Sequence, residues 1–341
     1  MKRGRAVVRM FFGLLIIITI GWSAYWWVGS TAQQTGLTAW LDDRRAAGWV
    51  ADYDDLSVKG YPSRFDTSIT NLNLADPKSG WAWNTPFLQV LMLSYQPNHV
   101  IAVLPPEHVV STPTERINVK SDVIRASIKF DANTDLALNA VSGEMENVIL
   151  ASNAGRTSEM KAAKLATRQT TGVANSHDLF FQADGVKPAR IFTKLIDPDS
   201  QLPDVFDTLR IDVTAGFDAP WDRHAVEGKK PEFTALTVKD VSATWGEMNF
   251  QAKGDLTFDA DGYPTGKLSV RAKNWKDMIT LGVSAGAIPQ DLQSTLEGGL
   301  GLLARLSGNP DTIDAPLSFK NGFISLGPIP IGRAPQLRLN P

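Results

Sequence analysis

The chain has no cysteine and only four histidines among its 341 residues. Without cysteine there are no disulfides, no thiolate metal ligands and no cysteine nucleophile. The histidines all precede Ser284, the centre of the pentapeptide GVSAG (282–286), which matches the G-x-S-x-G nucleophile elbow; they are His99, His108, His177 and His224. In α/β-hydrolases the histidine follows the serine, so this order excludes that fold. We interpret GVSAG as a glycine-bearing helix end before Pro289, where the glycines allow close packing.

A clustered basic stripe is also lacking. Four basic residues come before the first apolar run, and the remaining chain has 30 Lys and Arg against 36 Asp and Glu, a formal charge of −6. Because nucleic-acid binding requires a basic surface, we expect no nucleic-acid partner.

Motifs for metals and cofactors are missing as well. There is no HExxH pattern, no glycine-rich phosphate loop and no dinucleotide fingerprint. The fragment DADG (259–262) resembles the start of a calcium loop but lacks its closing glutamate, so we interpret it as a hairpin turn. We interpret the remaining acidic clusters as solvated turns; they contain Asp52, Asp54, Asp55, Asp197 and Asp199. We expect no cofactor, no metal site and no catalytic residue.

One long apolar run is present near the N-terminus. Residues 10–28 carry no charge and, as a helix, would be about 28 Å long, close to the hydrocarbon thickness of a bilayer. Basic residues precede the run, and no charge follows it until Asp42. The positive-inside rule therefore predicts a cytoplasmic segment (1–9), an inner-membrane signal anchor (10–28) and a periplasmic remainder. The predicted anchoring residues are Arg3, Arg5, Arg9, Trp22, Tyr25, Trp26 and Trp27.

A cleaved signal peptide that releases a soluble periplasmic protein is the alternative. Ser30 and Ala32 have the small side chains required ahead of a cleavage site. The aromatic residues at the outer end of the run favour a retained anchor, because such rings are typical of a membrane interface. Residues 29–48 then predict a helical stalk that ends at Gly48.

From residue 49 onwards, short segments of alternating polarity dominate. In LRIDVTAGF (209–217) apolar residues fall on one face and polar residues on the other, and VIRASIKF (123–130) and DLFFQADGV (178–186) repeat the pattern. Such alternation is typical of antiparallel sheets with one apolar face. We therefore expect a mainly β fold in two lobes, 49–195 and 196–341, with the boundary between Asp184 and Leu209.

Two stretches interrupt this β pattern. PARIFTKLIDP (188–198) predicts a short helix, and residues 275–307 predict a helix pair with a break at 287–289. The first helix of the pair spans Trp275 to about Gly286. The second carries one apolar seam and ends at Ser307–Pro310; its seam comprises Leu292, Leu296, Gly299, Leu303 and Leu306. Asn321 and Gly322 predict a closing hairpin turn.

The most suggestive polar cluster follows the strand 209–217. Its members are Asp218, Asp222, Arg223 and His224. Asp222 and His224 have the residue types of an acid/base pair. The simpler interpretation is a short helix that is capped by Asp218, has Pro220 in its first turn and ends at Gly228.

Several long blocks resemble a known family. They include GWVADYDDLSVKGYPSRFDTSITNLNL (48–74), GFDAPWDRHAVEGKKP (216–231) and LSGNPDTIDAPLSFKNGFISLGPIPIG (306–332). Together with the N-terminal anchor they are similar to the bacterial family called domain of unknown function 2125. This resemblance implies no reaction, ligand or site residue. In layout alone, an anchor followed by amphipathic strands is similar to AsmA-like and bridge-like lipid-transfer proteins.

We therefore expect an envelope protein of the inner membrane whose sheet offers an apolar groove to lipid or lipid-like ligands. If the sheets instead close on each other, the same alternation fills a sandwich core. The chain is then a structural or assembly factor that binds another envelope protein. A hydrolase that uses Asp222 and His224 is the least favoured function.

Overall fold

The computed structural model describes residues 2–198, 200, 202–286, 288–306 and 308–339. The predictions for Asp199, Ala287 and Ser307, and for the side chains of Arg3, Arg5 and Leu306, lie outside the described part. Two compact units divide the chain, Met1–Ile117 and Asn118–Pro341. The strand pairings described within each unit are antiparallel, so the predicted mainly β, antiparallel fold is confirmed.

The first unit combines a long helix with a sheet. Its elements are α1 (Lys2–Ala46), β1 (Val50–Asp52), β2 (Asp55–Lys59), β3 (Arg64–Asp76), β4 (Trp81–Leu93), β5 (Gln96–Val103) and β6 (Glu107–Ser111), and β7 (Arg116–Lys120) lies at the division. α1 is continuous through both the predicted anchor and the predicted stalk, and Gly48 follows its end with a positive φ. By length and composition α1 is able to cross a membrane.

The C-terminal half of α1 covers one face of this sheet. Leu41 of α1 is buried against Leu56 on β2 and Ile69 on β3. About two turns earlier in the helix, the Gln33 amide donates to the Thr67 hydroxyl at 2.7 Å, and the Gln34 amide donates to the Leu56 carbonyl at 2.9 Å. The C-terminal half of α1 is therefore part of the core of the first unit.

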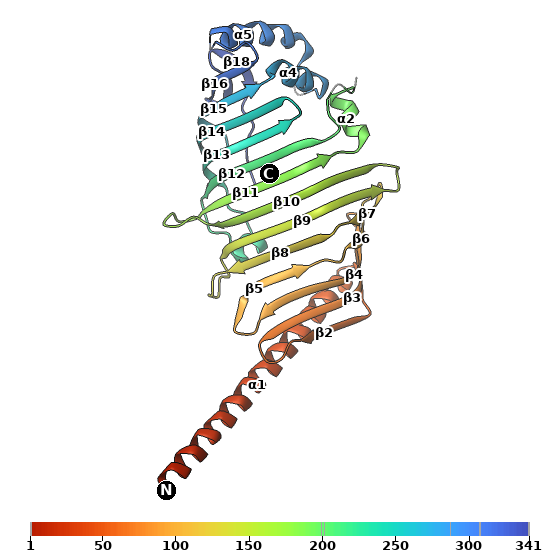
Figure 1. The fold of residues 1–341 in the computed structure, drawn as a ribbon, viewed down its shortest axis with the longest axis vertical. Helices are drawn as coiled ribbons and strands as arrows, with labels where there is room; N and C mark the ends of the chain where they lie inside the picture. The colour runs from red at the N-terminus through yellow and green to blue at the C-terminus, as the bar shows by residue number, and fades with distance from the viewer. Residues whose placement is uncertain (1, 199, 201, 287, 307, 340–341) are drawn as a thin grey trace. The chain divides into compact units, whose positions relative to one another are not determined.

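The second unit is built from long strands that follow one another in chain order (Figure 1). They are β8 (Val123–Phe130), β9 (Leu138–Ser152), β10 (Thr157–Gln169), β11 (Ser176–Lys187), β12 (Phe206–Phe217), β13 (Phe233–Trp245), β14 (Met248–Phe258), β15 (Pro264–Lys273), β16 (Thr312–Lys320), β17 (Phe323–Leu326) and β18 (Ile329–Arg333). Residues 184–209, where the sequence analysis places a lobe boundary, lie within this unit, and β11 pairs with β12 along its length. Turn residues Asn321 and Gly322 have the expected positive φ angles.

Within the described part of this unit, four α-helices join the strands. They are α2 (Arg190–Ile196), α3 (Arg223–Glu227), α4 (Trp275–Ser284) and α5 (Gln293–Leu306), with a short 3₁₀ turn, η1 (Gln290–Leu292), before α5. The predicted helix pair is thus present as α4 and α5, which lie at the β14–β18 end of the sheet in Figure 1. Ser284 is the last residue of α4 and is exposed, as expected for a helix end rather than an elbow between a strand and a helix.

Candidate functional site

The sheet of the second unit has one uninterrupted apolar face. Residues directly opposite each other on successive strands form cross-strand rows, and the central row of this face is uncharged from β8 to β16. It consists of Ala126, Gly143, Leu165, Phe181, Ile211, Val241, Ala252, Val270 and Ala315. The rows on either side contain mainly aliphatic and aromatic residues, with Thr167 as a polar exception. Strict alternation within each strand places these side chains on one face.

The opposite face is polar along its whole width. The neighbouring cross-strand row consists of Arg125, Glu144, Lys164, Gln182, Arg210, Ser242, Gln251, Arg271 and Asp314. Within this row, the neighbouring residues Arg125 and Glu144 form an ion pair. Water solvates this face, so the second unit has a single face that requires a covering layer.

Among the described residues, a helical layer covers the β15–β16 end of the apolar face; on β12, Val213 and Ala215 at one edge of the face are buried as well. At β15 and β16, Val270 and Ala315 are each 6% exposed. Trp275 and Ile279 of α4, with Leu296, Leu300 and Ala304 of α5, form the cluster that covers this end. The C-terminal segment adds Ala334, which is buried against Leu256 and Phe319.

Towards β8 the same face opens. Leu165 is 40% exposed and Ile211 is 42% exposed, although both belong to the same central row as Val270. Phe181 lies between them and is half-buried. The helices of the second unit make their extensive contacts with β14 and β16. We call the part of the apolar face carried by β8–β12 the open apolar face.

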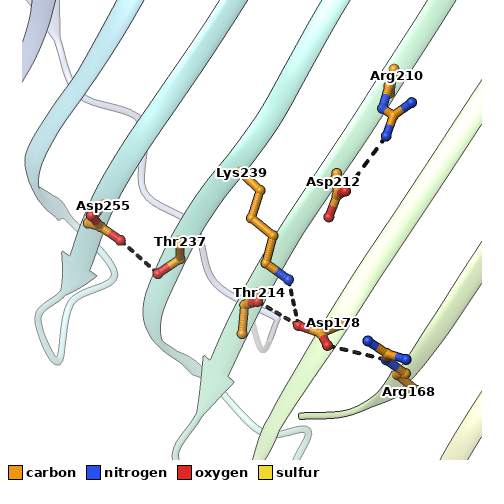
Figure 2. Close-up of polar contacts among 8 residues, drawn as sticks. All are labelled: Arg168, Asp178, Arg210, Asp212, Thr214, Thr237, Lys239 and Asp255. Atoms are coloured by element: carbon orange, nitrogen blue, oxygen red, sulfur yellow. Dashed lines mark hydrogen bonds and ion pairs between the residues drawn. The ribbon is translucent and has the colours of Figure 1, made fainter.

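On the polar face, Asp178 of β11 is the centre of a charged network (Figure 2). Lys239 donates to Asp178 Oδ1 at 2.8 Å, and the Thr214 hydroxyl donates to the same oxygen at 2.6 Å. Arg168 Nε donates to the other carboxylate oxygen at 3.3 Å. The hydrogen bond from Lys239, then that from Thr214, lowers the pKa of Asp178 to about 2. A carboxylate held this firmly ionised is a weak general base at neutral pH.

A β-bulge on β13 allows Lys239 to take part in this network. Between Val238 and Val241 two residues oppose the single residue Asp212 on β12. Lys239 and Asp240 therefore both point to the polar face. Lys239 donates to Asp178, and Asp240 forms an ion pair with Arg210, with Oδ2 3.3 Å from Nε. The guanidinium of Arg210 also lies 5.1 Å from the centre of the Phe180 ring.

A hollow of about 490 Å³ lies beside the network on the polar face. Its floor is made of small residues on β9 and β10, among them Ala140, Ser142 and Ala166, and Phe180 and Lys239 contribute to its sides. The charged groups that line it form ion pairs: Asp178 with Arg168 and Lys239, and Asp212 with Arg210. Among the described residues, no group of three or more His, Asp or Glu side chains is placed to hold a metal ion.

The family model described as "Uncharacterized protein conserved in bacteria (DUF2125)" matches residues 26–335. The chain belongs to this family. The resemblance found in the sequence is therefore confirmed over nearly the whole chain. No curated protein and no solved structure matches the chain. The DUF2125 region contains the open apolar face, the Asp178 network and the α1 residues from Trp26 onwards.

The polar cluster after β12 is arranged differently from the expectation. The cap of α3 is Asp222, whose Oδ1 accepts from the backbone amides of His224 at 2.8 Å and Ala225 at 3.1 Å, so the prediction that Asp218 caps this helix is wrong. Asp218 instead accepts from the amide of Glu232 at 2.7 Å, and Arg223 begins the helix. The geometry favours Asp222 as the cap because a capping side chain must reach the second or third amide of the helix.

The aromatic residues predicted to anchor α1 also contact the sheet of the first unit. Trp22 Nε1 donates to the Pro62 carbonyl at 2.8 Å, and Trp26 Nε1 donates to the Arg64 carbonyl at 2.8 Å. The Tyr25 hydroxyl donates to the Ser94 carbonyl. Trp27 is exposed, as is Arg9. Sequence patterns did not indicate these partners, because they lie more than thirty residues away along the chain.

Sequence reasoning also missed Asp178, Lys239 and the bulge. A signal was present in LTVKDVSATW (236–245), where two consecutive polar residues, Lys239 and Asp240, break the alternation between Val238 and Val241. Such a doubled polar position inside an alternating strand is typical of a bulge.

Proposed function

We propose that this DUF2125 protein is held at the inner membrane by α1 and that its open apolar face receives the acyl chains of a lipid or a similarly apolar envelope ligand. The observation that carries the proposal is the exposure of Leu165 and Ile211 in an uncharged row that α4 and α5 cover only at its other end. Large exposed apolar patches mark binding sites more often than ordinary surface does.

The energetics support an apolar occupant. Fully burying a leucine or isoleucine side chain contributes roughly 1.5–3 kcal/mol, so covering the exposed parts of Leu165 and Ile211 contributes on the order of 1 kcal/mol each. Phe181 and its half-buried neighbours on β8–β12 add to this. A ligand that covers the face therefore gains affinity from many small contributions, without any single strong contact.

The chemistry of the rows supports a chain-like ligand over a polar one. The central row from Ala126 to Ile211 offers neither charge nor side-chain hydrogen-bonding groups. Polar headgroups have no partner there and would lose their hydration, which is costly without compensating hydrogen bonds. Acyl chains carry no polar group whose hydration would be lost on this face, so lipid tails fit it better than sugars, peptides or nucleotides.

The packing of α1 supports a retained anchor over a cleaved signal. A cut after Ala32 would remove Trp22, Tyr25 and Trp26 from their carbonyl partners. It would also remove Gly29, which lies so close to the Phe65 ring that a Cβ atom would come within 2.6 Å of it, and Ser30, which is buried. With the basic residues on the N-terminal side, a periplasmic remainder follows from the positive-inside rule.

The test uses two neighbouring phenylalanines on opposite faces of β11. Phe181 lies in the central apolar row, and Phe180 lies on the polar face beside Arg210. The full chain, in membranes that contain a photoreactive phospholipid, is irradiated, and the cross-linked peptides are mapped by mass spectrometry. We expect cross-links on β10–β12, strongly reduced by Phe181→Glu and retained in Phe180→Glu, which introduces the same charge one residue away.

Cross-links confined to α1 would overturn the lipid proposal and leave only the anchor. An equal loss of lipid cross-links in both variants would indicate that the added charge disrupts the fold of the sheet and does not block a lipid site on one face. If a second protein is captured on β10–β12 in place of lipid, and Phe181→Glu abolishes that capture, the chain is an assembly factor for an envelope protein.

A further inference from the structure

The part of α1 that is free of the sheet is shorter than a bilayer is thick. Among the contacts of the described residues, Trp22 is the first residue of α1 whose side chain reaches the β-rich part of the unit, at Pro62 in the loop between β2 and β3. The apolar residues Met10–Gly21 before it span about 18 Å at 1.5 Å per residue. Extending the count back to Ala6, past Arg9, gives about 24 Å, still less than the ~30 Å of a hydrocarbon core.

The missing length lies where α1 touches the sheet. To span the hydrocarbon core, α1 requires about four further residues on the C-terminal side of Gly21, and these are Trp22–Tyr25. At this level the Ser23 hydroxyl and the Tyr61 hydroxyl lie 2.8 Å apart, and the Trp26 and Tyr61 rings meet edge to face. A bilayer that covers α1 to this depth therefore reaches the loops that flank β3 and β4.

The side chains exposed at this level suit the boundary between lipid and water. Tyr61 is 54% exposed, Tyr95 is 63% exposed and Trp27 is 67% exposed. Each ring combines a large apolar surface with one polar atom, the combination that is enriched at membrane interfaces. Three backbone carbonyls at this level accept hydrogen bonds from α1: Trp22, Tyr25 and Trp26 donate to Pro62, Ser94 and Arg64.

We propose that Trp26, Trp27, Tyr61 and Tyr95 form an aromatic collar that sits in the headgroup region of the bilayer, so that the β2–β3 and β4–β5 loops rest on the membrane. This inference rests on the proposed anchoring of α1 and extends it from the helix to the sheet. Because α1 and the sheet share a core, the collar fixes the first unit at a defined depth instead of leaving it on a flexible tether.

The absence of cysteine makes a depth measurement direct, because each introduced cysteine is the sole label site. Three full-length variants are labelled with an environment-sensitive fluorophore and reconstituted in phosphatidylethanolamine and phosphatidylglycerol vesicles: Tyr95→Cys in the collar, Ile16→Cys in the span and Lys78→Cys in the loop at the other end of β3 and β4. Lys78 is exposed and lies about 40 Å from the collar along a 13-residue strand, so it is a matched control in the same unit.

Quenching by lipids that carry a nitroxide at the headgroup or deep in the acyl chain is then compared. We expect the label at position 95 to be quenched at least threefold more by the headgroup probe than the label at position 78. We expect the label at position 16 to be quenched most by the deep probe. Equal, weak quenching at positions 95 and 78, with strong deep quenching at position 16, would overturn the collar and leave the anchor intact. Weak quenching at position 16 would overturn the anchoring itself.

Discussion

Both units carry sheets with an apolar face, yet the two faces are covered to different extents. In the first unit α1 lies on β2 and β3, and Leu41 and Ile69 are almost fully buried. In the second unit α4 and α5 cover β15 and β16, while Leu165 and Ile211, some strands away, remain about 40% exposed. The comparison teaches that alternation creates an apolar face, but a helix brought in from elsewhere decides whether the face becomes core or surface.

The largest effect is expected where the face is covered. Replacing Leu41 with alanine leaves a cavity under α1, and we expect the local free energy of unfolding of β2 and β3 to fall by about 2–5 kcal/mol. Leu165→Ala removes the same atoms from a half-exposed position, and we expect a loss of about 1 kcal/mol or less on β10. Amide hydrogen exchange of the full chain in a mild detergent measures both values strand by strand.

Equal losses for the two leucines would break the comparison, because they would show that Leu165 is as tightly packed as Leu41. A variant that fails to fold is replaced by Leu41→Val, for which the expected ordering is the same.

An intermediate effect is expected at the helix that covers the second sheet. A Cβ atom on Gly282 would come within 2.7 Å of Ile288 Cδ1, and Ile288 packs against the α4–α5 core. We expect Gly282→Leu to destabilise the second unit by about 1–3 kcal/mol, because the added side chain displaces Ile288. Ser284→Ala, two residues along at the exposed end of α4, should change stability by less than about 0.5 kcal/mol.

Thermal unfolding of the two variants in the same detergent provides the measurement. If Gly282→Leu left the stability unchanged and Ser284→Ala lowered it, the proposed close packing at Gly282 would be contradicted and a functional role for Ser284 would have to be reconsidered.

The smallest effect concerns the polar side of the same sheet. Because the pKa of Asp178 is about 2, below its ordinary 3.8, the ionised carboxylate stabilises the folded state above about pH 4. That contribution is lost as the pH falls from about 4 to about 2. We expect Asp178→Asn to lower stability at pH 7 by about 1 kcal/mol, since its partners Lys239 and Arg168 are largely exposed and solvent screens them.

Denaturant titrations at pH 7 and at pH 2 measure this difference in stability, which should be much smaller at pH 2, where about half of the carboxylate is protonated in the folded state. Asp255→Asn is the control, because Asp255 accepts from Thr237 without a charged partner and should cost less. If Asp178→Asn lowered the stability by the same amount at both pH values, the network would stabilise the fold through packing and not through the charge of Asp178.

Local sequence features predicted much of the fold. The segment VIRASIKF coincides with β8, the predicted helix from Trp275 begins α4 at that residue, and Asn321–Gly322 forms the predicted turn. Each of these depends on neighbours a few residues apart, which a sequence displays directly. The cap of α3 was misassigned to Asp218 because two aspartates of similar propensity stand four residues apart, and only the backbone geometry selects Asp222.

The candidate sites were less predictable for the same physical reason. The sequence showed that the strands of the second unit have apolar faces, and it placed the anchor and its aromatic residues. It did not show that Asp178 meets Lys239, 61 residues later, or that Trp22 meets Pro62, 40 residues later. These contacts depend on strand register and on the route of the chain, which are set by the sum of many weak interactions over the whole unit.

By itself, then, the sequence determined the membrane-length helix, the strands and the polarity of their two faces, because these follow from charge and from periods of two and 3.6 residues. Tertiary structure alone decided that the helix long enough to span a membrane also contributes to the core of the first unit, that α4 and α5 cover one end of the second sheet, and that Leu165 and Ile211 stay about 40% exposed. Covering a face requires segments far apart in the chain to meet, and no local pattern encodes which face they reach.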